Sequence, residues 1–279
     1  MNKPTHRKLG TAVLALATAA LLPTTAAAQY AQPATPGKWQ FAATIYAYLP
    51  SLGGTLSVPV TTGGSGINVN ADTLIDSLKM AFMGSLDAHN GRWGMFTDVL
   101  YMDLGGDKSN TRDFSIGTIG LPASTTADLK LDLKGTIWTL AGEYRVVSDP
   151  AWKVDVLAGA RYFGLKPTLG WSIYGDLGPI GSAGRSGSKE IDETVWDGIV
   201  GVKGAYAFGA DRRWSVPFYF DIGTGQSDLT WQAAAGIAYS YHWGDLVAMW
   251  RYVDYNFKSD KALQDMNFNG PMFGATFRW

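Results

Sequence analysis

The sequence predicts an all-β protein: a transmembrane, antiparallel, up-and-down β-barrel of about ten strands, with eight or twelve strands as alternatives. Two patterns lead to this fold class. Apolar and polar residues alternate with a period of two over segments long enough to cross a bilayer, and the connections between these segments are alternately short and long. The mean hydropathy of −0.03 agrees, because an apolar face and a polar face cancel in the average.

The charge balance and the missing cysteines exclude several classes of function. The 279 residues include 23 Lys and Arg against 24 Asp and Glu, so the formal net charge is −1. No large positive field is available to attract phosphates, and we expect no nucleic-acid partner. Because the chain contains no Cys, disulfide scaffolds, thiolate metal sites and cysteine nucleophiles are also excluded.

The N-terminal segment 1–28 is predicted to be a cleavable export signal. It begins with basic residues, continues with the apolar run 9–22 and ends in small residues that precede a cleavage site, here after Ala28. The apolar run is shorter than the roughly 20 residues of a membrane-spanning helix. Residues 29–38 contain two prolines and are expected to form a flexible lead-in, and 39–279 are expected to form the barrel.

Ten segments of the exported chain alternate as β-strands do. Trp152 and Val154, for example, share one face, whereas Lys153 lies on the other. Each segment exceeds the roughly 9–11 residues that a tilted strand needs to cross a bilayer. The predicted strands lie near 39–49, 77–89, 92–104, 130–147, 151–165, 194–208, 213–225, 229–243, 246–257 and 266–279.

The connections between the strands carry a second signal. Short turns follow the second, fourth, sixth and eighth strands, whereas long connections rich in Gly, Ser and Thr lie near 50–76, 105–129 and 166–193. Short turns at one rim and long loops at the other are typical of outer-membrane barrels, and an even strand count returns both termini to the short-turn, periplasmic side. Within the first long connection, 53–70 is expected to form a hairpin and 71–78 a short helical turn.

Tryptophan residues gather near the ends of the predicted strands. An aromatic ring with a polar edge prefers the headgroup layer of a membrane, so these positions indicate the two interfaces. Trp196 and Trp231 are assigned to the long-loop rim. The interface aromatics of the predicted periplasmic rim are Trp39, Trp93, Trp152, Trp214 and Trp243.

The polar faces of the strands carry charged residues that we expect to project into the lumen. Because isolated charges in a narrow lumen are costly, opposite signs should pair. The network either fills a closed barrel or forms a charged constriction that selects solutes, and the first is favoured because about eight strands leave width only for side chains. The predicted lumen charge network consists of Asp98, Glu143, Arg145, Asp155, Arg161, Asp197, Lys203, Asp221 and Arg251.

The C-terminal strand ends in alternating aromatic residues, Phe273, Phe277 and the terminal Trp279. This pattern resembles the C-terminal assembly signal of bacterial outer-membrane β-barrel proteins, and the chain is similar to the small OmpA/OmpX/OmpW-like barrels. The stretch 91–104 resembles a group of proteobacterial outer-membrane proteins, from which we carry over no functional residue. The resemblance implies a Gram-negative cell outer membrane, contact with its lipid and lipopolysaccharide, and recognition by the barrel-assembly machinery.

We expect a structural, ligand-binding or surface-interaction role through the long extracellular loops, and no catalysis. Enzymes among the resembled barrels use a His at the extracellular rim, whereas His89 and His242 lie beside short periplasmic turns. No catalytic, cofactor-binding or metal residue is assigned, no cofactor is expected, and the loop ligand is not identified. The alternatives are a narrow channel for small solutes or ions and, third, a soluble periplasmic β-barrel whose apolar face forms the core.

Overall fold

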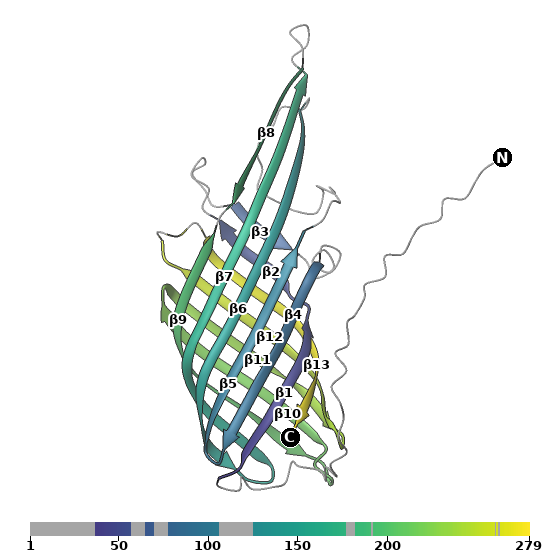
Figure 1. Cartoon of the computed structure of the whole chain (residues 1–279), viewed down its shortest axis with the longest axis vertical. Coiled ribbons are helices and arrows are strands. Elements are labelled where there is room, and N and C mark those ends of the chain that lie inside the picture. Colours follow the sequence, from purple (N-terminus) through teal and green to yellow (C-terminus); the bar gives the residue numbers. More distant parts are fainter. Residues whose placement is uncertain are drawn as a thin grey trace, which may run out of the picture.

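The computed structural model describes residues 37–56, 65–69, 78–105, 125–176, 182–190, 192–259, 261 and 263–279. The regular structure in these ranges is β-structure, in thirteen strands that form one sheet (Figure 1). Over the same residues, no helix has the length and apolarity needed to cross a membrane.

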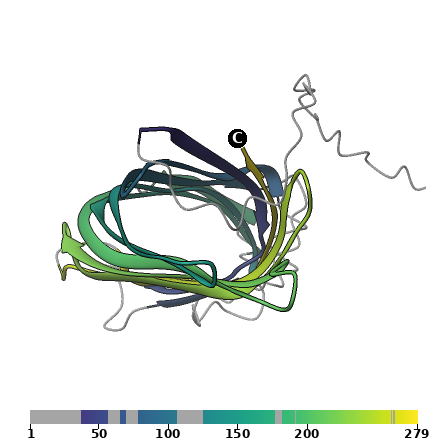
Figure 2. The same ribbon diagram turned by 90° about the horizontal axis from the view of Figure 1, so that it is seen from below.

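Ten of the strands close into a barrel in which each strand is antiparallel to its neighbours (Figure 2). This confirms the predicted fold class and strand count. The barrel strands, in their order around the wall, are β1 (Trp39–Tyr48), β4 (Leu78–Asn90), β5 (Trp93–Leu104), β6 (Thr125–Ser148), β7 (Trp152–Asp176), β9 (Glu193–Phe208), β10 (Trp214–Gly225), β11 (Ser227–Ser240), β12 (Gly244–Phe257) and β13 (Leu263–Arg278).

The barrel closes between its first and last strands. β1 pairs with β13 from Ala42 opposite Arg278 to Tyr48 opposite Met272. At the rim, the backbone N–H groups of Phe41 and Trp279 donate to each other's carbonyl oxygens at 2.9 and 3.1 Å. Closure matters because an open sheet edge cannot be satisfied in hydrocarbon.

Beyond Tyr48 the first strand is interrupted and then continues as β2 (Ser51–Leu56), which pairs with the start of β13 and with β3 (Ser65–Val69). The interruption lies at Leu49 and Pro50, where proline lacks a backbone N–H for the ladder. The hairpin predicted within 53–70 is therefore present as β2 and β3. Its tip lies outside the described residues, as does the helical turn predicted at 71–78, apart from Leu78, which begins β4.

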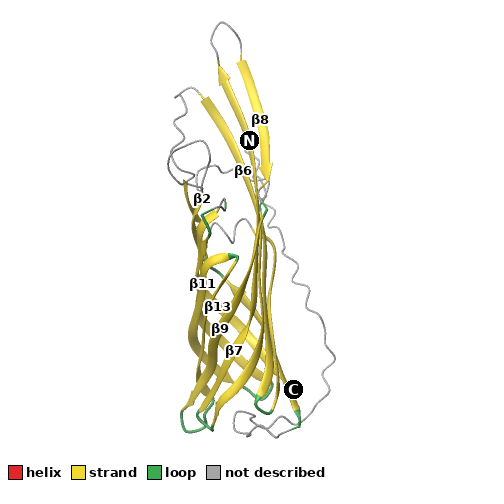
Figure 3. Cartoon of the chain, turned by 90° about the vertical axis from the view of Figure 1, so that its left-hand side faces the viewer, coloured by secondary structure: helices red, strands yellow, loops and turns green. Residues whose placement is uncertain are grey.

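Two predictions for the long connections were wrong. The segments 105–129 and 166–193 were expected to be loops, but β6 begins at Thr125, β7 continues to Asp176, and β8 (Ser182–Glu190) pairs with the end of β7. These strands rise beyond the rest of the barrel as a three-stranded extension (Figure 3). The Gly- and Ser-rich sequence of β8 has low strand propensity, but pairing with an already ordered strand overrides that preference.

The outer surface of the barrel is apolar. Ile45, Val200 and Trp250 expose more than half of their surface. Aromatic rings contact one another around the short-turn rim, including Trp93 with Tyr144 and Trp152 with Tyr206. In a water-soluble protein so continuous an exposed apolar surface would be a liability, whereas lipid tails solvate it.

The lumen is not uniformly polar, in contrast to the polar inner face that the alternation predicts. Its half nearest the long connections is a hydrophobic core of inward-facing side chains from most barrel strands. Phe163 packs against Tyr255, Phe257 and Phe268 there, with ring centroids 4.6 to 6.3 Å apart. Most of the charged residues occupy the middle and the short-turn half of the lumen, whereas Asp197 and Glu193 lie near the start of β9, on the long-connection side.

An arginine placed on the outer face should destabilise the barrel according to its depth in the bilayer. Val200 lies at the middle of β9, whereas Val146 lies beside the short turn after β6, and both are at least half exposed. We expect Val200→Arg to lower the free energy of unfolding in lipid vesicles by about 2–4 kcal/mol and Val146→Arg by about 0–1 kcal/mol. Urea titration followed by Trp fluorescence measures both, and equal small losses would contradict the membrane-spanning orientation.

Candidate functional site: the charged lumen

The predicted lumen charges do face the inside of the barrel. Arg145 and Lys203 are half-buried, and the other seven, Asp98, Glu143, Asp155, Arg161, Asp197, Asp221 and Arg251, are buried. They lie on six different strands, β5, β6, β7, β9, β10 and β12, so the barrel wall itself brings them together. The structure sorts them into three groups at different levels of the lumen.

The first group surrounds Arg161, whose side chain is fully buried. Its guanidinium forms an ion pair with Asp221 and donates to the hydroxyls of Thr139 and Thr230 at 3.2 and 3.4 Å. Four strands thus contribute to one cluster. Nearby, Asp197 accepts hydrogen bonds from the backbone N–H and the hydroxyl of Ser227 at 2.9 and 2.5 Å.

The second group spans the lumen around Arg251. Its guanidinium contacts Asp98 at 2.8 Å, the amide oxygen of Gln232 at 3.0 Å and the Tyr46 hydroxyl oxygen at 2.9 Å. The Tyr46 hydroxyl donates in turn to Asp98 at 2.7 Å. Side chains from β1, β5, β11 and β12 meet here. The ion pair between Asp98 on β5 and Arg251 on β12 therefore connects two strands that are not neighbours in the sheet.

The third group lies nearer the short-turn rim. The Lys203 ammonium forms ion pairs with Asp87 and, at 2.7 Å, with Glu143, while Arg145 binds both carboxylate oxygens of Asp155 at 2.8 and 3.0 Å. The opposite charges that these groups bring together offset the large cost of burying each one alone.

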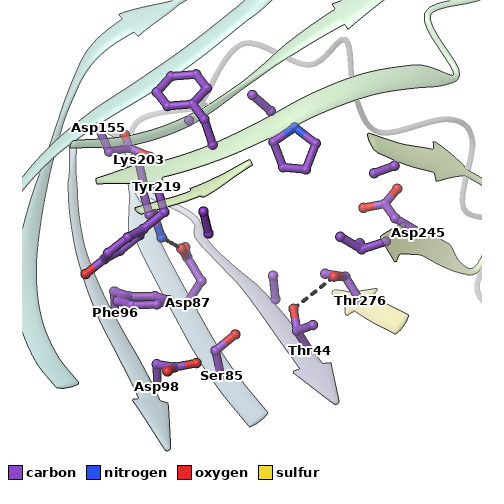
Figure 4. Close-up of a pocket in the computed structure, with 18 of the residues that line it drawn as sticks. Thr44, Ser85, Asp87, Phe96, Asp98, Asp155, Lys203, Tyr219, Asp245 and Thr276 are labelled. Atoms are coloured by element: carbon purple, nitrogen blue, oxygen red, sulfur yellow. Dashed lines mark hydrogen bonds and ion pairs between the residues drawn. The ribbon is translucent and has the colours of Figure 1, made fainter. Parts of the chain in front are cut away.

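A cavity of about 340 Å³ opens among these residues on the short-turn side (Figure 4). It extends from Gln40 and Arg278 near the rim to Asp98 and Arg251. Asp87, Asp98, Asp155 and Lys203 are seen together around it in the close-up. Apolar residues such as Phe218 line the cavity together with these charged residues, and two further lining residues, Tyr46 and Met272, belong to the hydrophobic core.

His89 lies beside the short turn after β4, as predicted, but its inward orientation was not predicted. Its side chain is buried in the lumen, 2.8 Å from Glu143 and 3.3 Å from Asp87. The sequence does contain a signal for this position, because His89 lies two residues after the charged Asp87 and residues two apart in a strand share a face. His242, in contrast, is exposed in the turn before β12.

The predicted membrane-interface residues lie where the alternation places them. The five rim tryptophans, Trp39, Trp93, Trp152, Trp214 and Trp243, are between 37% and 70% exposed, which suits the headgroup layer. The C-terminal residues Phe273, Phe277 and Trp279 are likewise exposed on the outer face.

Comparisons with known proteins reveal similarity in fold only. No protein-family model matches the chain, and no curated protein matches it in sequence. The chain is similar to the outer membrane protease OmpT of Escherichia coli, with a TM-score of 0.48, 10% identity and coverage of 88% of this chain and 97% of that one. Ail, the attachment invasion locus protein of Yersinia pestis, has a TM-score of 0.36 and 10% identity, with coverage of 86% of this chain and 98% of that one. The toluene transporter TodX of Pseudomonas putida has a TM-score of 0.28 and 11% identity, with coverage of 88% of this chain and 91% of that one. At these values the likeness carries no argument about function. The closed ten-stranded antiparallel sheet and its apolar exterior are the architecture of a small transmembrane β-barrel.

Removing one partner of the buried Arg161–Asp221 pair should be far more harmful than removing both. Arg161→Met leaves the Asp221 carboxylate buried without its cation, and we expect the free energy of unfolding in vesicles to fall by about 3–5 kcal/mol. The double variant Arg161→Met/Asp221→Asn should recover most of that loss. Arg213→Met, at an exposed rim position, serves as the control and should change nothing measurable. Additive losses in the double variant would contradict the pairing.

Proposed function

We propose that the protein is an integral outer-membrane barrel with a closed lumen that interacts with other molecules at the cell surface, without catalysis. The observation that carries this proposal is the three-stranded extension of β6, β7 and β8. The pairing between β5 and β6 ends at Leu104 opposite Leu133, but the eight residues 125–132 of β6 still pair with β7. At 3.3 Å per residue, this part of the extension is roughly 26 Å long. Ordered structure of this height on the long-connection side is well placed to bind a surface ligand.

The packing of the lumen supports a closed barrel. Between the cavity and the long connections lies the hydrophobic core, in which Tyr48, Val195, Val253 and Tyr255 have no exposed surface. A side-chain-filled lumen is what a barrel of this size favours over an aqueous channel. We therefore assign the working surface to the outside of the cell and a structural role to most of the lumen.

A trimmed barrel tests the role of the extension. Leu104 is paired with Leu133 and Leu165 with Glu193, so 105–132 and 166–192 can each be replaced by an Asn-Gly hairpin turn. We expect the trimmed chain to reach the outer membrane and to keep heat-modifiable gel migration, because the membrane-spanning ladders stay intact. Cells carrying the full chain should adhere to arrays of immobilised glycans and matrix proteins, and cells carrying the trimmed chain should lose that adhesion. Equal adhesion by both would contradict the proposal.

A narrow channel is the second candidate, and the cavity that extends to Asp98 and Arg251 favours it. The two functions differ in planar bilayers. We expect the purified full chain to insert without discrete conductance steps, because the hydrophobic core blocks the lumen. Reproducible steps whose ion selectivity changes with Arg161→Gln or Asp221→Asn would support the channel instead.

A further inference from the structure

A buried group of potential metal ligands lies at the short-turn end of the lumen, apart from the surface assigned above. Asp87 and His89 come from β4 and Glu143 from β6. One ligand atom from each of the three lies within 4.8 Å of the others. Ligand atoms bound at 2.0–2.2 Å to a tetrahedral Zn²⁺ lie about 3.4 Å apart, so small side-chain movements would complete the geometry.

Two members of the group are buried without satisfactory hydrogen bonds. The His89 side chain is 4% exposed and that of Glu143 is 0% exposed. Among the described residues, neither ring nitrogen of His89 has a partner with hydrogen-bond geometry, and the Glu143 carboxylate meets the His89 ring and the Lys203 ammonium, which lies 2.7 Å from its Oε1. His89 Nε2 and Glu143 Oε2 are 2.8 Å apart, so this distance has to lengthen to about 3.4 Å for both atoms to bind one ion. A buried polar group in this state is costly, and a bound cation would satisfy both.

The wall of the barrel is shaped around the His89 ring. Gly94 on β5 lies opposite His89 in the ladder, and a Cβ atom there would lie 2.5 Å from the ring. Glycine at this position therefore leaves the space that the imidazole occupies, and the ring is held with its nitrogens among the carboxylates. The same ring and Asp87 line the cavity, which gives an ion a route from the short-turn rim.

A side-chain cation already lies at the position where a metal would bind. The Lys203 ammonium contacts Asp87 and Glu143, the two carboxylates of the group. Asp155 is also near, 3.6 Å from His89, but Arg145 engages both of its oxygens. A divalent ion that displaced Lys203 toward the cavity would replace one positive charge by two beside the same carboxylates.

We propose that Asp87, His89 and Glu143 form a binding site for a divalent transition-metal ion of the Zn²⁺ type, with Lys203 as the cation that it displaces. An imidazole nitrogen favours Zn²⁺ and its neighbours in the transition series over Ca²⁺ and Mg²⁺, which take oxygen ligands. The proposal stands whether or not the extracellular extension binds a ligand, since the two lie at opposite ends of the barrel.

The test uses the untagged full-length barrel in detergent and Zn²⁺ itself, measured by calorimetry, with Co²⁺ absorption as a report on coordination. We expect one Zn²⁺ per chain, retained in excess Ca²⁺. His89→Gln and Glu143→Gln should each weaken binding at least tenfold, whereas His242→Gln, which changes the exposed histidine of a turn, should leave the affinity unchanged. Lys203→Met removes the competing cation and should tighten binding about fivefold or more.

The folded state of each variant is checked by heat-modifiable migration. Lys203→Met keeps all three proposed ligands, so it tests the site even where a ligand variant does not fold. Absence of stoichiometric Zn²⁺ binding to the natural chain would overturn the proposal and leave His89 as a buried side chain that only packs beside carboxylates. Undiminished binding by folded His89→Gln, or weaker binding by Lys203→Met, would overturn it as well.

Discussion

A strand in hydrocarbon must satisfy its backbone N–H and C=O groups through neighbouring strands, and the rest of this structure depends on how the sheet closes to do so. β1 and β13 complete the ring, and the hydrogen bonds between Phe41 and Trp279 hold it at the rim. Closure fixes which side chains face lipid and which face inward. It also creates a lumen that the inward side chains have to fill.

The lumen is filled in two ways that differ in cost. Near the long connections, apolar side chains such as Leu100, Phe163 and Phe268 pack as they would in the core of a soluble protein. Toward the short turns, charged side chains from strands on different sides of the wall meet in pairs. Such pairs add little net stability compared with apolar packing, because desolvation offsets their attraction. Their retention here is consistent with the cavity, which keeps part of this region open for water or a small ligand.

Most of the barrel could be predicted because lipid and lumen impose opposite preferences on successive residues. That rule identifies all ten barrel strands and the inward position of the charged residues. It is least informative in β5, where apolar residues occupy both faces beyond Asp98 and the lumen becomes a hydrophobic core. It also fails for β8, whose Gly- and Ser-rich sequence gives no alternation and which is ordered by pairing with β7.

The contacts within the lumen charge network could not be predicted in detail. Sequence spacing indicates which residues share a face and which strands neighbour each other, but not which side chains meet across the lumen. That depends on the tilt and curvature of the closed sheet. The position of His89 is different, because it lies two residues after the charged Asp87, and that spacing alone indicates that both side chains share the inward face.

The ion pairs have a consequence for how the barrel enters a membrane. Asp98 and Arg251 are 153 positions apart in the chain, and Asp87 and Lys203 are 116 apart. A chain folded only as far as β5 would hold the carboxylates of Asp87 and Asp98 with neither cation, at a cost that rises as water leaves. The electrostatic cost of inserting the first strands into the membrane therefore falls only when β9 and β12, which carry the two cations, join the sheet. Charge neutralisation thus couples the two halves of the polypeptide and favours insertion as a single cooperative event.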